Sequence, residues 1–212
     1  MAERQALPSR TRRAPVSARG ARTRQALVQA ARSVFERDGF LDARITDITA
    51  TAGVATGSFY TYFTSKEDAF AAVMEEVGEE MLHPRLKEIA DRDDPEAVID
   101  AANRAYLLAY RRNAKLMALL EQVAQIDGDF RRLRLRRARA FGERNAQANS
   151  RLQERGLADP ELDPRLAADA LSGMVSRMAY LRYVLGFGTA SPETLARTLT
   201  RLWVNALGIT RR

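Results

Sequence analysis

Two short helical segments separated by a glycine constrain the fold of this chain more than any other stretch. Apolar residues recur at helical spacing over residues 45–52, which predicts the first helix. We expect Thr46 to cap that helix by offering its hydroxyl to a backbone N–H group. Gly53 is expected to end it, because glycine adopts a left-handed backbone conformation at the lowest cost. A second helix then begins at Thr56, so the stretch predicts a helix-turn-helix.

The second helix presents two different faces. Phe59 and Phe63 stand four residues apart and are expected to face inward. A helix this short is not stable alone, so it must pack on its neighbours. Its remaining faces can approach a polar, charged surface closely, because they carry small or hydroxyl-bearing residues, namely Gly57, Ser58, Tyr60, Thr61 and Tyr62.

A further helix is expected directly after this pair. Ser65 and Asp68 have the spacing of a capping box. Lys66 falls in the first turn, where a cation opposes the helix dipole. A phosphate arriving from outside would be attracted by both the unpaired N–H groups and Lys66. Helix, turn, helix and an anion-binding helix start form the layout of a major-groove DNA reader.

Several motifs follow one another within residues 22–77. They are Phe35, Gly39-Phe40, Thr46, Ile48, Ala52-Gly53-Val54, Gly57-Ser58-Phe59-Tyr60, Tyr62-Phe63 and Ser65-Lys66-Glu67. With these motifs, the segment resembles the DNA-binding domain of the tetracycline-repressor (TetR) family of transcriptional regulators. Ala55 departs from the family pattern, which often has a serine there to cap the recognition helix; Thr56 could take over the cap, or the cap could be absent. The resemblance implies that the C-terminal helices form a four-helix dimer interface.

The net charge of +7 is unevenly placed along the chain. Residues 1–66 hold 11 Lys+Arg against 5 Asp+Glu, whereas the remainder holds 23 against 22. The excess therefore lies on the segment with the helix-turn-helix, which indicates a polyanionic partner. Arginine-rich codon usage is the alternative explanation, but usage alone would not bias the location.

Composition argues against several other classes of protein. The chain has no cysteine, which excludes disulfides and thiol catalysis. It has no apolar run long enough to span a membrane and no secretory signal, so a cytoplasmic protein is expected. The single histidine, His83, is expected to end a helix before Pro84 rather than to bind a metal. Since no phosphate-binding loop is present either, we expect neither an enzyme nor a cofactor.

We divide the chain into a disordered basic arm (1–21), a helix-turn-helix domain (22–65) and a helical regulatory and dimerisation domain (66–212). The arm could enter a minor groove or remain a solvated tail. Its arginines are Arg4, Arg10, Arg12, Arg13 and Arg19.

No alternating pattern supports a strand, so the fold class is all-α. Acid-Pro and Ser-Pro pairs mark helix starts in the second half of the chain. The predicted helices outside the helix-turn-helix cover residues 22–38, 66–82, 95–110, 114–126, 129–155, 164–185 and 192–207.

The last two predicted helices carry wide apolar faces. These faces could close an internal core or pair with a second copy of the chain. Helix-turn-helix readers usually need two heads roughly 34 Å apart, which a two-fold dimer supplies. The faces comprise Leu171, Met174, Val175, Met178, Ala179 and Leu185 on one helix, and Leu195, Leu199, Leu202, Trp203 and Ala206 on the other.

The helix from Asp129 is rich in arginine, and Arg137 and Arg144 fall on its apolar stripe. Both could be solvated, with their stems covering apolar surface. Alternatively, one or both could point into a cavity and pair with an anionic group of a ligand. Aromatic and methionine residues could line such a cavity or simply fill the core. The candidates are Tyr106, Tyr110, Met117, Leu120, Phe141, Met174, Met178 and Tyr183.

These features predict a ligand-responsive repressor that binds a (pseudo)palindromic operator as a homodimer and is released by a small molecule. An architectural DNA-binding protein without a ligand is the alternative. We expect phosphate contacts from Thr46, Tyr60, Tyr62 and Lys66, and approaches to base edges from Thr56, Gly57, Ser58 and Thr61.

Overall fold

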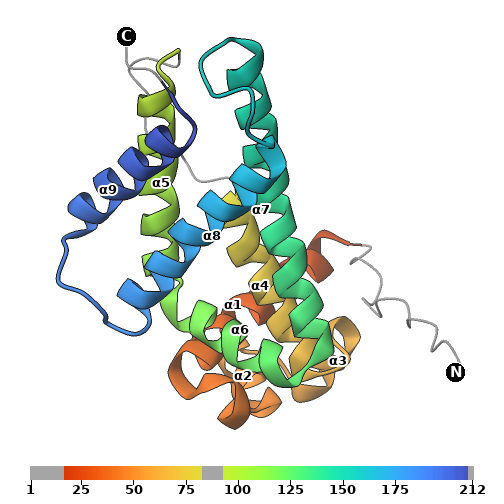
Figure 1. Cartoon of the computed structure of the whole chain (residues 1–212). Helices are drawn as coiled ribbons and strands as arrows, with labels where there is room; N and C mark the ends of the chain where they lie inside the picture. The colour runs from red at the N-terminus through yellow and green to blue at the C-terminus, as the bar shows by residue number, and fades with distance from the viewer. Residues whose placement is uncertain (1–16, 83–92, 210–212) are drawn as a thin grey trace, which may run out of the picture. The chain divides into compact units, whose positions relative to one another are not determined.

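The computed structural model describes residues 17–82 and 93–209, and every regular element in those ranges is an α-helix (Figure 1). The predicted all-α fold class is therefore confirmed. Contacts divide the chain into two units, the first ending at Glu76 and the second beginning at Val77. The division falls inside a helix, and the predicted domain boundary between residues 65 and 66 remains a prediction.

The first unit contains α1 (Ala18–Asp42), α2 (Ile45–Ala52), α3 (Thr56–Tyr62) and most of α4 (Lys66–Leu82). The second unit contains the end of α4 and the five remaining helices. These are α5 (Pro95–Arg112), α6 (Ala114–Ile126), α7 (Gly128–Glu154), α8 (Pro164–Tyr183) and α9 (Pro192–Ala206).

Side-chain caps explain why the starts of the later helices could be predicted. The Asp94 carboxylate accepts a hydrogen bond from the Glu96 N–H at 2.9 Å, and proline follows it in the first turn of α5. Asp163 caps α8 in the same way, and the Ser191 hydroxyl caps α9. Proline fits there because the first N–H groups of a helix have no partner within the helix. The five helices begin and end within a few residues of the predicted positions.

The start of α1 differs from the prediction. The helix begins at Ala18 rather than Arg22, because the Ser17 hydroxyl accepts a hydrogen bond from the Gly20 N–H at 3.1 Å. Residues 18–21 are therefore helical and do not belong to a disordered arm. Gly39, with φ 80° and ψ −179°, breaks the helix at the predicted place. The other arm arginines, and His83-Pro84, lie outside the described residues.

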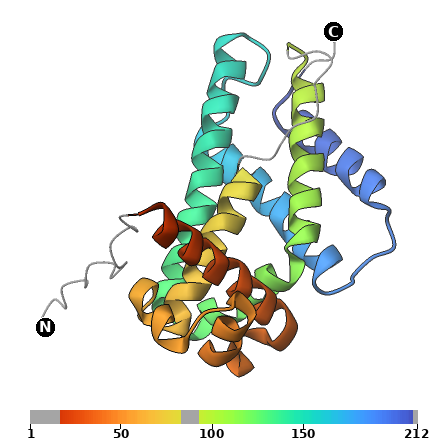
Figure 2. The same ribbon diagram turned by 180° about the vertical axis from the view of Figure 1, so that it is seen from behind.

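Aromatic packing holds the first unit together. Phe70 of α4 lies 5.0 Å from Phe35 and 5.2 Å from Phe40, measured between ring centroids, and all three rings are buried. Helix α1 can be followed along its length in Figure 2. The side chains of Gln25 and Gln29 on this helix donate hydrogen bonds to the Glu76 carboxylate of α4. Helices α1 and α4 thereby form a base on which the two shorter helices are held.

In the second unit, α7 runs beside α8 and α5 runs beside α9 (Figure 1). The Asn103 amide of α5 donates to the Thr200 hydroxyl of α9 at 3.2 Å, and both side chains are buried. Buried polar groups are tolerated when they are paired in this way. Among the described helices, none is long and apolar enough to cross a membrane.

Candidate nucleic-acid and ligand sites

The turn between α2 and α3 is built as the sequence predicts. Gly53 ends α2 with φ 67° and ψ 33°, a left-handed conformation. Its N–H donates to the Ala50 carbonyl, and the N–H of Val54 donates to the Thr49 carbonyl at 3.0 Å. These bonds satisfy carbonyl groups that the helix end leaves unpaired.

Thr46 does not cap α2, which corrects the prediction. Arg44 occupies the N-cap position, and its side chain makes no capping hydrogen bond to the described residues. Thr46 lies inside the first turn with its side chain exposed. Thr49 instead joins the two helices, since its buried hydroxyl lies 3.3 Å from that of Thr56. This contact holds the start of α3, whose N-cap residue, Ala55, has no capping side chain.

Helix α3 keeps its apolar side inside the unit and its polar side outside. Phe59 and Phe63 are buried as predicted, with ring centroids 5.4 Å apart. Tyr60 is 47% exposed, and Tyr62 is partly exposed. All the predicted DNA contacts reach the surface: Thr46, Thr56, Gly57, Tyr60 and Thr61 are exposed, and Ser58, Tyr62 and Lys66 are half-buried.

Lys66 is held by contacts within the first unit. Its ammonium group donates to the Leu41 carbonyl at 3.0 Å and lies 4.9 Å from the centroid of the Phe40 ring. The lysine therefore bridges the start of α4 and the end of α1. A phosphate contact by Lys66 requires the ammonium group to share its remaining donors, since it carries three.

The capping box at the start of α4 forms only in part. The Ser65 hydroxyl accepts a hydrogen bond from the Asp68 N–H at 3.2 Å, as predicted. The Asp68 carboxylate accepts from the N–H of Thr64 at 2.9 Å and from its hydroxyl. The acidic partner of the motif thus fixes the turn after α3 as well as the helix start.

Two arginines of the first unit were not predicted as candidates. Arg44 is exposed at the start of α2, and the Arg24 guanidinium lies over the Phe63 ring at 5.4 Å. Arg44 could have been predicted as a candidate DNA contact, because it directly precedes the helix-turn-helix in the sequence. The location of Arg24 depends on the packing of α1 and could not be inferred from spacing.

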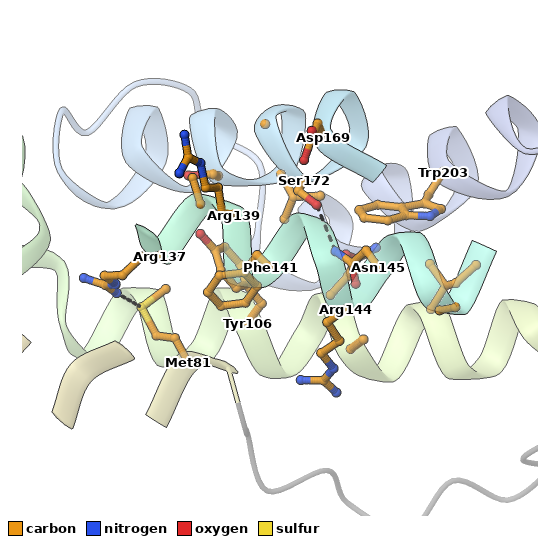
Figure 3. Close-up of a pocket in the computed structure, with 18 of the residues that line it drawn as sticks. Met81, Tyr106, Arg137, Arg139, Phe141, Arg144, Asn145, Asp169, Ser172 and Trp203 are labelled. Carbon is orange, nitrogen blue, oxygen red and sulfur yellow. Dashed lines mark hydrogen bonds between the residues drawn. The ribbon is translucent and has the colours of Figure 1, made fainter. Parts of the chain in front are cut away.

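The second unit contains a cavity of about 900 Å³ between α5, α6, α7 and α8 (Figure 3). A volume of this size suits a drug-sized molecule. Most of the predicted candidates line it, namely Tyr106, Tyr110, Met117, Leu120, Arg137, Phe141 and Arg144.

Met174, Met178 and Tyr183 do not line the cavity, which corrects the prediction. Helix α8 turns a polar stripe toward it, and both methionines lie on the opposite side of that helix. Tyr183 lies at the end of α8. The lining residues that the sequence did not reveal include Glu121, Asn145, Asp169, Ser172, Ser176 and Trp203.

Arg137 and Arg144 differ in their surroundings. The Nη1 atom of Arg137 is buried and has no hydrogen-bond partner among the described residues. Its Nη2 atom approaches the sulfur atoms of Met81 and Met117 at 3.4 and 3.5 Å. Arg144 is exposed and donates a hydrogen bond to the Leu82 carbonyl. Among the described arginines of this cavity wall, Arg137 alone has a buried guanidinium nitrogen without a hydrogen-bond partner.

The electrostatics of the cavity follow from burial. Burial lowers the pKa of the Arg137 guanidinium, and the neighbouring Tyr106, Tyr110 and Glu121 oppose that change. Burial also raises the pKa of the Tyr106 hydroxyl. A hydrogen bond with Ser176 and the charge of Arg137 act in the opposite direction and have smaller effects. At neutral pH the Tyr106 hydroxyl is therefore neutral and the Arg137 guanidinium is charged, because arginine does not lose its proton in proteins.

Residues 27–73 match the family model for bacterial regulatory proteins of the tetR family. The chain belongs to the TetR family. This match falls within the segment whose motifs resemble that family, and it includes all of α2 and α3. As a TetR-family protein, the chain is a DNA-binding transcriptional regulator.

Relatives of this TetR-family chain support the same assignment. It is 26% identical to the uncharacterized HTH-type transcriptional regulator YdgC of Bacillus subtilis over 195 residues, which are 89% of this chain and 94% of the relative. It is 36% identical to the HTH-type transcriptional repressor NicS of Pseudomonas putida over 90 residues, or 42% of each chain. The fold matches the solved structure of the fatty acid degradation regulator FadR of Bacillus halodurans, with a TM-score of 0.73, 20% identity and coverage of 89% and 97%.

Proposed function

We propose that this TetR-family regulator is a repressor that binds a (pseudo)palindromic operator as a homodimer and releases it when a small molecule enters the cavity. The observation that carries the proposal is that α3 has a buried aromatic side and an exposed side of small and hydroxyl-bearing residues. Its phenylalanines fix it in the first unit, and its small and hydroxyl-bearing residues lie outside. The name of the relative NicS supports repression as the direction of control.

The proposed DNA contacts divide into two kinds. Thr46, Tyr60, Tyr62 and Lys66 contact phosphates and fix the register of α3 in the major groove. The other four proposed contacts approach base edges, where donors and acceptors distinguish all four base pairs. They are Thr56, Gly57, Ser58 and Thr61. The protein acts where the chromosome lies, in the bacterial cytoplasm.

Lys66→Ala should weaken binding to every duplex by a similar factor. The ammonium group contributes charge rather than sequence readout, so the salt dependence of binding should also become shallower, by about one unit of slope. Fluorescence anisotropy titrations at several salt concentrations measure both effects. Arg136→Ala, which removes an exposed charge of α7, is the control and should change neither. An unchanged affinity and slope for Lys66→Ala would exclude the phosphate contact.

The dimer interface is proposed on the outward surfaces of α8 and α9. Part of the apolar faces predicted for pairing is used inside the protomer, since Leu171, Val175 and Trp203 are buried. Apolar side chains nevertheless remain outside, as expected of a surface that pairs with a second copy. The exposed ones are Leu166 (70%) on α8, Leu185 (56%) and Phe187 (68%) in the segment that follows α8, and Leu202 (48%) on α9.

Leu202→Glu should separate the dimer into single chains. A carboxylate at a buried interface position costs at least about 2 kcal/mol, which raises the dimer dissociation constant roughly 30-fold or more. Sedimentation velocity measures the change in mass. Leu108→Glu is a matched control, because Leu108 is 45% exposed on α5. A dimeric Leu202→Glu protein, or a wild-type protein that sediments as a single chain, would contradict the proposed interface.

The cavity favours an effector-controlled regulator over an architectural DNA-binding protein. An architectural protein needs no such space, whereas an effector needs an enclosed site in the second unit. A bound molecule can release DNA only to the extent that it binds the released form better. Coupling of this kind is typically about 1–3 kcal/mol, or roughly 5- to 150-fold in DNA affinity. Helix α4 has residues in both units and is the proposed link between them.

Selection of bound sequences from a pool of random duplexes tests the proposed function. We expect enrichment of one sequence with two-fold symmetry and half-sites about one helical turn apart. Recovery of duplexes without a common sequence would favour the architectural alternative. No retention of duplex DNA at moderate salt would overturn the proposal.

A further inference from the structure

We infer that the cavity of the second unit takes an amphipathic monocarboxylate, with the carboxylate bound by Arg137. This inference rests on the proposed function of the cavity as an effector site, and it names the chemical class of the effector. Three features of the wall carry it: a buried guanidinium nitrogen without an acceptor, an acid that is already paired with another arginine, and aromatic side chains along the cavity.

The first feature is the unsatisfied donor capacity of Arg137. Its Nη1 atom is buried without a hydrogen-bond partner in the described part of the chain. Within the described ranges, its Nη2 atom donates only to the thioether sulfurs of Met81 and Met117, which are weak acceptors. A buried cation without an acceptor is costly, and a planar guanidinium matches a carboxylate through two parallel hydrogen bonds. A carboxylate that enters the cavity would supply the hydrogen-bond acceptors that the Arg137 guanidinium lacks.

The second feature is the pairing of Glu121, an acid of the same wall. Glu121 influences Arg137 electrostatically, but its carboxylate accepts a hydrogen bond from the Arg134 Nε at 2.7 Å. Glu121 thus pairs with a different arginine and leaves the Arg137 guanidinium open. The Nη1 donors of Arg137 therefore remain available to an anionic group of a ligand, and a carboxylate matches the planar guanidinium.

The third feature is the shape of the remaining space. Figure 3 shows Arg137 at one end of the labelled residues and Trp203 at the other, with Tyr106 and Phe141 between them. The tyrosine and phenylalanine rings meet edge to face, with centroids 5.4 Å apart. A ligand with its charge at Arg137 would therefore lay an apolar body along aromatic side chains. This arrangement favours an amphipathic acid over a small polar anion.

Arg137 also contacts the end of α4 that belongs to the second unit. Its Nη2 atom touches Met81, and a Cβ added at Gly78 would lie 3.5 Å from its Nε atom. A carboxylate that draws the guanidinium away from Met81 changes the packing of this helix end directly. The same residue would therefore bind the ligand and report its presence to α4.

Paired titrations of fatty acids and their alcohols test the inference without DNA. Hexanoate, decanoate and tetradecanoate are each compared with the alcohol of the same length, below the concentration at which the probes form micelles. The chain has one tryptophan, Trp203, which lines the cavity, so its fluorescence reports binding. We expect at least one acid to bind, and its alcohol to bind about tenfold more weakly or worse, as for the loss of a hydrogen bond to a charged group.

Arg137→Met removes the guanidinium while keeping an unbranched side chain. It should reduce the preference for the acid over the alcohol to about one, whereas Arg136→Met on the exposed side of α7 should keep the full preference. Thermal unfolding of both variants checks that they fold. The comparison of acid with alcohol on the wild-type protein needs no variant, and it decides the question if Arg137→Met does not fold.

Equal binding of acid and alcohol, or no binding of any acid in the series, would overturn the inference. An undiminished preference in a folded Arg137→Met protein would overturn it too. These failures are distinct from failure of the proposed function. If a neutral molecule releases DNA, the proposed repressor function holds although the inferred carboxylate is wrong. If an acid binds at Arg137 without changing DNA affinity, the inferred carboxylate site holds and only the proposed effector control is contradicted.

Discussion

Phe59→Ala should destabilise the first unit by about 3–5 kcal/mol, because removing a buried phenylalanine leaves a cavity that the surroundings fill only in part. Phe59 is completely buried and packs against Phe63 beneath the exposed face of α3. A small domain has only about 5–15 kcal/mol of stability in total, so the expected loss is a large fraction of it. Chemical denaturation followed by circular dichroism measures the loss.

Tyr60→Ala provides the neighbouring control. The Tyr60 ring meets the Phe59 ring edge to face at 5.6 Å, but the side chain is 47% exposed. Its removal should cost less than about 1.5 kcal/mol in stability while lowering affinity for all duplexes. Equal destabilisation by the two substitutions would mean that α3 is not anchored through Phe59.

Gly57→Leu should abolish most DNA binding while leaving the fold intact. A Cβ at Gly57 would meet no heavy atom of the described chain within 4 Å outside its own helix backbone and chain neighbours. Replacing a helical glycine should raise stability by up to about 1 kcal/mol. In the major groove, however, the leucine would force α3 away from the bases, at a cost of about 1–3 kcal/mol for the clash and as much again for lost base contacts. We expect affinity for the selected duplex to fall roughly 100-fold.

A graded series separates this steric effect from a change in folding. Gly57→Ala, Gly57→Val and Gly57→Leu should bind the selected duplex progressively more weakly. Their unfolding midpoints should not fall in parallel, because the added atoms lie in solvent in the unbound protein. Wild-type affinity in the leucine variant would place position 57 outside the DNA interface.

The sequence was sufficient where local chemistry decides the structure. Gly53 and the pair Phe59 and Phe63 were predicted correctly, because a left-handed turn favours glycine and spacing sets the face of a helix. The cap by Thr46 was wrong, since Arg44 already occupies the position before the first turn. The start of α1 was missed because the Ser17 cap lies in a stretch whose composition resembles a disordered arm.

The cavity could be predicted only in part, because its wall depends on how helices face one another. Arg137 and Arg144 share the same stripe of α7, yet the Arg137 guanidinium contacts side chains of α4 and α6 whereas Arg144 is exposed. No spacing rule distinguishes them. Met174 and Met178 are of a residue type that often lines cavities. Both lie on the side of α8 opposite Ser172, and Ser172 lines the cavity. Relative helix rotation, which sequence periodicity leaves open, decides these outcomes.

Footprinting with dimethyl sulfate on the selected duplex tests the central claim most directly. The reagent methylates guanine at N7 in the major groove and adenine at N3 in the minor groove, so it reports which groove the protein occupies. If two copies of α3 lie in successive major grooves, guanine N7 should be protected in two half-sites about one helical turn apart. Full reactivity of guanine N7 throughout the bound duplex, or protection confined to adenine N3, would contradict the account.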